Sequence, residues 1–233
     1  MKKKLIIVLC SLVAAVTLVV VSILGTVAYL TSSAAVSNVF TIGNVGIVMD
    51  ESKVDQDGNV ISGGGRVDTN TYKLVPNKKY TKDPTITVNA GSTPSWLFVL
   101  VRNDIEKIEI VSDDGDKMTI AEQMLANGWK VYTTASTGNV YVYCGTNTEL
   151  TPKAVGSADE EKYKLFDYFY LDPNANVSAY GAAKVTLTAV AIQSDGFNDD
   201  PVGTENAKTA LDKAWAAVVA TYPYIHTGTG SGN

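Results

Sequence analysis

The sequence is poor in the residues that build most catalytic and metal sites. It contains one histidine, His226, and two cysteines, Cys10 and Cys144, among 233 residues. The usual zinc ligand sets need several His or Cys side chains, which this chain cannot supply. A Ser-His-Asp triad would depend on His226, which lies in a tail flanked by proline and glycine, a poor place for preorganised catalysis. We therefore predict that the protein is not an enzyme and has no catalytic, cofactor-binding or metal-binding residues.

An excess of positive charge is also missing. The formal net charge is −5 at pH 7, and three of the lysines lie at the extreme N-terminus. An acidic surface repels the phosphate backbone, so we predict no nucleic-acid partner. The same surface favours solubility outside the cell and permits cation binding.

What the sequence does have is a long apolar segment near its N-terminus. Lysines at 2–4 are followed by an apolar run over 5–24 and then by small residues. This order is typical of a secretory signal. We predict a signal peptide over 1–28, cleaved between Ala28 and Tyr29, and a protein secreted to the extracellular matrix or the cell surface.

The apolar run, roughly 20 residues, is also long enough to span a bilayer as a helix. The alternative is that 1–28 stays as an N-terminal anchor, which would be the protein's only contact with a membrane. Both interpretations place residues 29–233 outside, because the basic N-terminus stays in the cytoplasm. Cys10 is interpreted as an apolar residue of the signal helix. Cys144, then the single remaining cysteine, is interpreted as a buried small residue of a strand over 140–144.

The segment after the predicted cleavage site is small, polar and free of glycine and proline. It is a poor core strand, but an extended arm of this kind can pair with an exposed sheet edge through main-chain hydrogen bonds. We predict a donor-strand arm over 29–38, made of Tyr29, Leu30, Thr31, Ser32, Ser33, Ala34, Ala35, Val36, Ser37 and Asn38.

Short strands separated by turn residues dominate the rest of the chain. The segment Trp96–Val101 is apolar on both faces, which predicts a central strand covered on each side. Glycines at 43 and 46 predict a bend between strands near 40–42 and 45–49. Further strands are expected over 72–75, 85–88, 106–111, 129–132, 140–144, 163–171 and 184–193.

Two helices are expected among these strands. Thr119 and Glu122 form a capping-box pattern, which predicts a helix near 119–127. A second helix is predicted near 205–221, followed by a disordered tail over 226–233. The sequence therefore predicts an all-β domain with minor helices over 39–225, a β-sandwich of jelly-roll or Greek-key type preceded by the signal helix.

One loop and one aromatic strand each leave an alternative interpretation open. Residues 55–59 are predicted to form a hairpin tip, and a calcium loop is the alternative, although the glycine is misplaced for an EF-hand. The aromatic stripe of Phe166, Tyr168 and Tyr170 is interpreted as cross-strand packing, with a sugar-binding platform as the alternative.

Several of these segments together resemble the TasA/camelysin family. The lysine-rich start, the junction at 25–31, the pattern Phe40-x-x-Gly43-x-Val45-x-Ile47 and the block at 82–89 are similar to that family. Weaker similarities lie at 96–101 and 189–197, and in the helix that contains Ala214 and Trp215. The chain departs from the family at Pro76-Asn77, where Pro-Gly is expected, but asparagine tolerates a left-handed backbone.

The resemblance implies a jelly-roll fold, secretion by a Gram-positive cell, and processing by the SipW-type signal peptidase. It also implies assembly into biofilm-matrix fibres, in which the freed arm of one subunit completes the sheet of the next. The implied partners are further copies of the chain in a head-to-tail fibre, the peptidase and other matrix proteins. Cleavage would release the arm, and head-to-tail contacts propagate instead of closing as dimers.

Two other functions stay open. One is a monomeric cell-surface adhesin that uses the aromatic residues near 163–170. The other is a metallopeptidase, since camelysin-like proteins have been classed as such, but the chain has no His-Glu-x-x-His motif.

Overall fold

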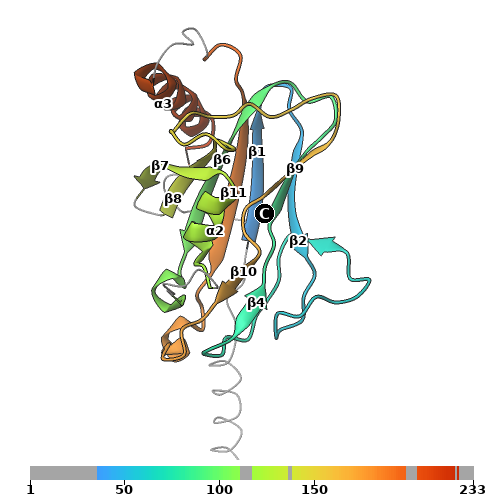
Figure 1. Ribbon diagram of the computed structural model, residues 1–233. Coiled ribbons are helices and arrows are strands. Elements are labelled where there is room, and N and C mark those ends of the chain that lie inside the picture. The colour runs from blue at the N-terminus through green and yellow to red at the C-terminus, as the bar shows by residue number, and fades with distance from the viewer. Residues whose placement is uncertain (1–35, 111–116, 136–137, 198–203, 224, 226–233) are drawn as a thin grey trace, which may run out of the picture.

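The computed structural model describes residues 36–110, 117–135, 138–197, 204–223 and 225 (Figure 1). The predicted signal peptide, the cleavage site at Ala28 and Tyr29, and the tail over 226–233 lie outside these residues. Within the described ranges, neither α-helix is both long and apolar enough to cross a membrane.

The regular structure of the described chain is dominated by two β-sheets, so the fold is all-β with minor helices. The larger sheet has five strands in the order β1-β11-β6-β8-β7. Their bounds are Val36–Ile42 (β1), Val185–Gln193 (β11), Ser95–Asn103 (β6), Gly138–Tyr143 (β8) and Trp129–Ala135 (β7).

The second sheet has four strands in the order β3-β2-β5-β9. Strands β10 and β4 pair with each other as a separate two-stranded ribbon. The bounds are Arg66–Val67 (β3), Ile47–Ser52 (β2), Thr85–Val88 (β5), Glu161–Lys164 (β9), Tyr168–Tyr170 (β10) and Lys79–Thr81 (β4).

The two sheets pack face to face as a sandwich. In β6, alternate residues Leu97, Val99 and Val101 enter the core shared with β2 and β5. The intervening residues, among them Phe98, enter a second core against helix α3 (Thr204–Thr221). Figure 1 accordingly shows α3 on the side of the five-stranded sheet away from β2 and β9. The prediction that the Trp96–Val101 segment is covered on both faces is confirmed.

The predicted capping box is also confirmed. Helix α2 (Ile120–Ala126) begins after Thr119, whose hydroxyl accepts from the Glu122 N–H at 3.2 Å, while the Thr119 N–H donates to the Glu122 carboxylate at 2.7 Å. Gly128 follows the helix with φ +87°, a conformation that favours glycine. Helix α3 begins at Thr204, one residue before its predicted start. Two short 3-10 helices complete the elements, Glu106–Ile108 (η1) and Val177–Tyr180 (η2).

Three predicted strands are wrong. Residues 72–75 form an irregular segment, residues 106–108 form η1, and 163–171 is divided between β9 and β10, which belong to different sheets. Each segment nevertheless buries apolar side chains, for example Tyr72, Ile108 and Phe166. Irregular backbone that packs against the core can bury such side chains, and period-two reasoning cannot distinguish it from a strand.

The first and last strands of the sandwich are neighbours, as the ends of a Greek key are. However, β1 runs parallel to β11, with Val36 opposite Thr186 and Ile42 opposite Ile192, while the other strand pairs are antiparallel. This parallel pair is the point at which the topology departs from an all-antiparallel jelly roll.

Candidate functional site

The predicted donor arm overlaps an edge strand. Residues 29–35 of the arm lie outside the described residues, but Val36, Ser37 and Asn38 are the first three residues of β1. They pair with residues 186–188 of β11. The prediction of a free arm that extends to Asn38 is therefore wrong for its last three residues, which pair within their own chain. The reason is that β11 is buried along most of its length, and its outer backbone groups would lack partners without β1.

β1 is held less tightly than the strands inside the sheet. Its residues from Val39 to Ile42 are all only partly buried. The ring of Phe40 packs on Tyr222, which follows α3, with centroids 4.6 Å apart, and the Tyr222 hydroxyl donates to the Thr41 carbonyl at 2.8 Å. The strand is thus fixed by one neighbouring strand and by the end of the C-terminal helix.

A glycine bend takes the chain from β1 to the other sheet. Gly43 has φ +98°, and a Cβ there would lie 2.7 Å from Cβ of Gln193. Any other residue would therefore meet both backbone strain and a clash with the end of β11. This bend marks the boundary between the edge strand and β2, the first strand of the second sheet.

The opposite edge of the same sheet is β7. It pairs with β8, and no other strand pairs with it in the part of the chain that the structure describes. Its residue Val131 is 42% exposed, so this edge also presents an apolar side chain to solvent. A strand that follows the arm and an edge without a second partner therefore lie at opposite sides of one sheet.

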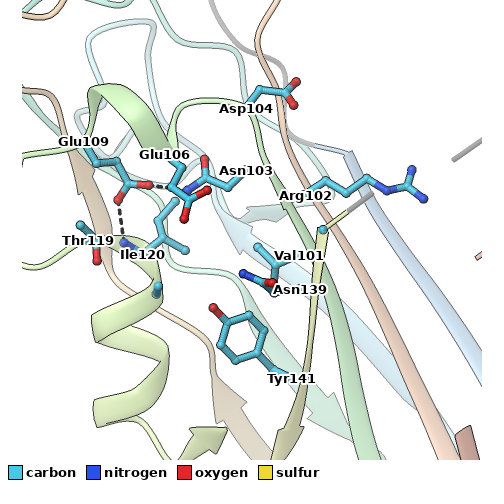
Figure 2. A pocket seen from close by; sticks show the side chains of 12 residues that line it. Val101, Arg102, Asn103, Asp104, Glu106, Glu109, Thr119, Ile120, Asn139 and Tyr141 are labelled. Atoms are coloured by element: carbon cyan, nitrogen blue, oxygen red, sulfur yellow. Dashed lines mark hydrogen bonds between the residues drawn. The ribbon is translucent and has the colours of Figure 1, made fainter. Parts of the chain in front are cut away.

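A cavity of about 400 Å³ lies beside the end of β6 (Figure 2). Glu109 is 5% exposed there, accepts a hydrogen bond from the Asn103 side chain, and accepts a second from the Ile120 N–H at 2.6 Å. Burial raises the pKa of Glu109 to about 7, against these two hydrogen bonds, which lower it. Arg102 points away from Glu109 in Figure 2, and its guanidinium donates to the Ile225 carbonyl at 3.3 Å. The Glu109 carboxylate in this cavity can therefore take up a proton close to neutral pH.

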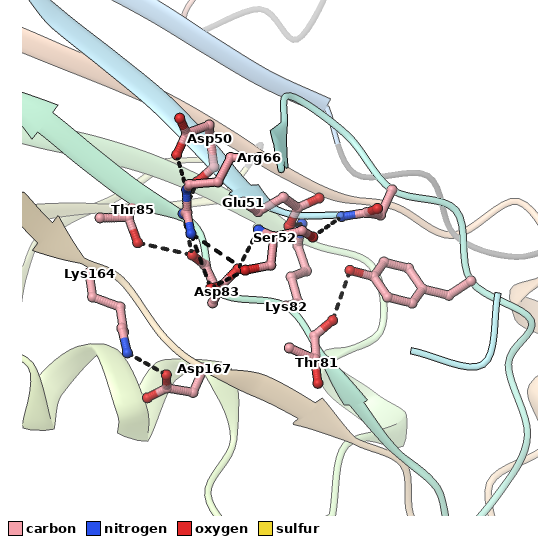
Figure 3. A network of polar contacts seen from close by, with 12 residues as sticks. Asp50, Glu51, Ser52, Arg66, Thr81, Lys82, Asp83, Thr85, Lys164 and Asp167 are labelled. Atoms are coloured by element: carbon pink, nitrogen blue, oxygen red, sulfur yellow. Dashed lines mark hydrogen bonds and ion pairs between the residues drawn. The ribbon is translucent and has the colours of Figure 1, made fainter. Parts of the chain in front are cut away.

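A polar network joins β2, β3 and the segment before β5 (Figure 3). Arg66 contacts Asp50 at 2.5 Å and Asp83 at 3.2 Å. The Asp83 carboxylate also accepts from the N–H and the hydroxyl of Ser52, at 2.6 and 2.8 Å. Both carboxylate oxygens of Asp83 therefore accept hydrogen bonds. We call the contacts of Arg66 with Asp50 and Asp83 the clamp, because they hold β2, β3 and the segment before β5 together.

Beside this network is a fully buried ion pair. Nζ of Lys82 lies 2.6 Å from Oε2 of Glu51, and their side chains are 2% and 3% exposed. Burial lowers the pKa of Lys82, although the Glu51 carboxylate acts in the opposite direction. Asn70, 6% exposed, lies close by and bonds to the backbone of Val54 and Ser52.

The remaining predicted residues are placed as follows. Residues 55–59 form the predicted hairpin tip, and Oδ1 of Asp55 accepts from the N–H groups of Asp57 and Asn59, both at 2.9 Å. These bonds lower the pKa of Asp55, with the Asn59 N–H as the largest cause. No group of three His, Cys, Asp or Glu side chains able to hold a metal is found among the described residues.

The aromatic stripe does not form one platform. Phe166 is fully buried, whereas Tyr168 and Tyr170 are half-buried in β10, where Nζ of Lys79 lies 3.7 Å from the Tyr168 ring centroid. Cys144 is fully buried, as predicted, and burial raises the pKa of its thiol to about 11. Sequence reasoning missed Glu109, Glu51 and Lys82. For Glu51 a signal existed, because it follows Ile47 and Met49 at period two and so continues the buried face of β2.

Comparison with known proteins adds no relative: no family model, no curated protein and no solved structure matches this chain.

Proposed function

We propose that this protein is a secreted structural protein of an extracellular biofilm matrix, which polymerises into fibres when each subunit donates its N-terminal arm to the next. The proposal begins from the signal-like N-terminus and the family resemblance of the sequence. The donated segment would be 29–35, extended by β1 where β1 leaves its own sheet. In that event β11 or β7 of the next subunit would offer the edge that receives it.

One observation carries the proposal. The strand that continues the arm and the strand edge with no second partner among the described residues, β1 and β7, are opposite edges of the same sheet. Pairing the arm of one subunit with β7 of another would extend the sheet across the subunit boundary. Because the two surfaces differ, the contact is head-to-tail and leaves a free donor and a free acceptor at the fibre ends.

Deleting residues 29–35 tests the donor. The deletion keeps all of β1, so a folded monomer should remain and filaments should be absent by electron microscopy. The shortened chain keeps its acceptor edge and should therefore shorten the filaments of intact protein when the two are mixed. Deleting 226–233, a tail of similar length at the other end, is the matched control. Filaments of normal length from the 29–35 deletion would contradict the proposal and favour a monomeric adhesin.

Val131→Lys tests the acceptor. A lysine at this position places a charge on β7, a device that natural edge strands use against pairing. Val48→Lys is the matched control, because Val48 is 47% exposed but lies on β2 of the other sheet, where it pairs with Thr87 of β5. We expect filament loss from Val131→Lys alone, with circular dichroism showing that both variants stay folded. Equal assembly of the two variants would exclude β7 as the acceptor.

A further inference from the structure

The buried pair of Lys82 and Glu51 is poorly satisfied as an ion pair. Oε1 of Glu51 has no hydrogen-bond partner among the described residues and is shielded from solvent. A lysine ammonium has three hydrogens to donate, and the described contact of Lys82 is with Oε2 of Glu51. A buried pair repays its desolvation only when the remaining hydrogen-bonding capacity is also satisfied. The nearby clamp of Arg66 and Asp83 meets this condition, and the pair of Lys82 and Glu51 does not.

Burial lowers the pKa of Lys82, although the Glu51 carboxylate acts in the opposite direction, and that carboxylate is the described acceptor beside its ammonium. Condensation between the two groups requires the transfer of one ammonium proton to this carboxylate. The products are a free amine and a carboxylic acid, held 2.6 Å apart between Nζ and Oε2. Both side chains are at most 3% exposed, so water has little access to them. An amine held against a carboxylic acid in a dry site has the proximity that intramolecular reactions exploit.

We propose that Lys82 and Glu51 condense into an intramolecular amide cross-link. The neutral Nζ attacks Cδ of Glu51, a C–N bond forms, and one C–O bond of the carboxyl group breaks. Of the three ammonium hydrogens, one passes to the carboxylate oxygen, one leaves with that oxygen to complete a water molecule, and one stays on the amide. The positive and negative charges cancel, no electrons are transferred, and water is the only product besides the amide.

The cross-link would remove the unfavourable features of the site. It eliminates both buried charges and one of the two carboxyl oxygens, and it leaves one N–H and one C=O. It also ties β2 to the segment that follows β4, closing the loop between them, which contains the two-residue strand β3. Cys144 is the only cysteine beyond residue 28, so this part of the chain cannot tie itself together with an internal disulfide. The inference does not depend on fibre assembly.

Intact-mass spectrometry of the purified, denatured protein tests the proposal. The measured mass should be lower by one water than the mass calculated for the N-terminus found by sequencing. A mass equal to the calculated value means that the pair stays ionic and overturns the proposal. A mass lower by one ammonia, with Lys82 joined to Asn70, overturns it as well, because the amide carbon would then come from the wrong residue.

Tryptic mapping locates the bond. Trypsin does not cleave after an acylated lysine, so Lys82 should stay inside a peptide spanning 80–102, joined through Glu51 to the peptide that ends at Lys53. Lys164 is the matched internal control, since its Nζ lies 2.6 Å from Asp167 but the two side chains are 48% and 54% exposed. Water reaches that pair, so trypsin should cleave after Lys164 and its amine should react with an acylating reagent. Separate, unlinked peptides at Lys82 would contradict the proposal.

Lys82→Arg supplies the matched variant. A guanidinium keeps the positive charge beside Glu51 but stays protonated, so it cannot act as the nucleophile. The mass of this variant should equal its calculated value. A deficit of one water that persists in Lys82→Arg would show that another pair carries the cross-link. If the variant fails to fold, the mapping of the unmodified sequence still decides, because it needs no substitution.

Discussion

The edge strand β1 and the central strand β6 belong to one sheet but differ in almost every property that fixes a strand. β6 is paired on both sides, and its residues from Ser95 to Val101 are at most 5% exposed. β1 is paired on one side, in the parallel sense, and its residues from Val39 to Ile42 are all partly exposed. One sheet therefore holds both a strand that is buried on both faces and an edge strand with few buried contacts.

The difference has a direct energetic meaning. Opening β6 would expose both cores of the molecule, so it should happen only with global unfolding. Opening β1 exposes one side of β11 and the contact between Phe40 and Tyr222, and leaves the two cores largely in place. Local opening at low cost is a property of elements with few buried contacts.

Phe98→Ala should have the largest effect on stability. Phe98 is fully buried in β6, and its ring lies 5.4 Å from Trp215 of α3 and 5.8 Å from Tyr132, measured between centroids. Its truncation should lower the free energy of unfolding by about 3–5 kcal/mol, because the surrounding side chains cannot close the cavity. Chemical denaturation measures this change.

Phe40→Ala is the matched substitution in β1. The same truncation of a half-buried ring should cost about 1–2 kcal/mol, since less apolar area returns to water. Equal losses for the two variants would mean that β1 is as central to stability as β6, and the comparison would fail.

Glu109 should make stability depend on pH at the end of β6, whereas β1 contains no titratable side chain. The folded protein holds the Glu109 proton up to a pKa of about 7, while the unfolded chain loses it near 4.5. The unfolded state therefore binds fewer protons between these values, and stability falls as pH rises from 4.5 to 7. The loss should approach about 3 kcal/mol and should level off above pH 7.

Glu109→Gln should remove that slope. The amide cannot ionise, although it can accept only one of the two hydrogen bonds, so the variant should be less stable than the parent at low pH. Glu160→Gln, at a side chain 55% exposed, is the control and should keep the slope. Denaturation midpoints at several pH values measure the effect, and a slope retained in Glu109→Gln would assign it to another group.

Tyr222→Phe should have the smallest effect and the most local one. It removes the hydroxyl that donates to the Thr41 carbonyl but keeps the ring against Phe40. The cost should be about 1 kcal/mol. Hydrogen exchange should show faster exchange of the β1 amides, with those of β6 unchanged. Faster exchange in both strands would show that they open together.

Much of the fold follows from the sequence where a local pattern decides the structure. The apolar run at 96–101 predicts the central strand because both of its faces carry large side chains. The pair Thr119 and Glu122 predicts the start of α2 because the capping box is a contact between near neighbours. Asn77 takes the left-handed conformation, φ 58°, that the Pro76-Asn77 turn predicts.

The rest depends on contacts between distant parts of the chain. The alternation of β2 puts Glu51 on the same buried face as Ile47 and Met49, but no local pattern indicates its partner, Lys82, which lies thirty-one positions away. The pairing of Val36–Asn38 depends on β11, which lies near the other end of the chain. Polar composition alone predicts that this segment is part of a free arm. The sequence predicts strands near β1 and β7, but only the strand order of the sheet shows that these two strands are its opposite edges.

The parallel pairing of β1 with β11 also sets an order of events in time. The first strand of the domain waits for the last, since no hairpin links them and almost the whole chain lies between. While the ribosome is still adding the residues of β11, the N-terminal segment has no strand of its own chain to join. β1 therefore remains without its sheet partner until synthesis is nearly complete.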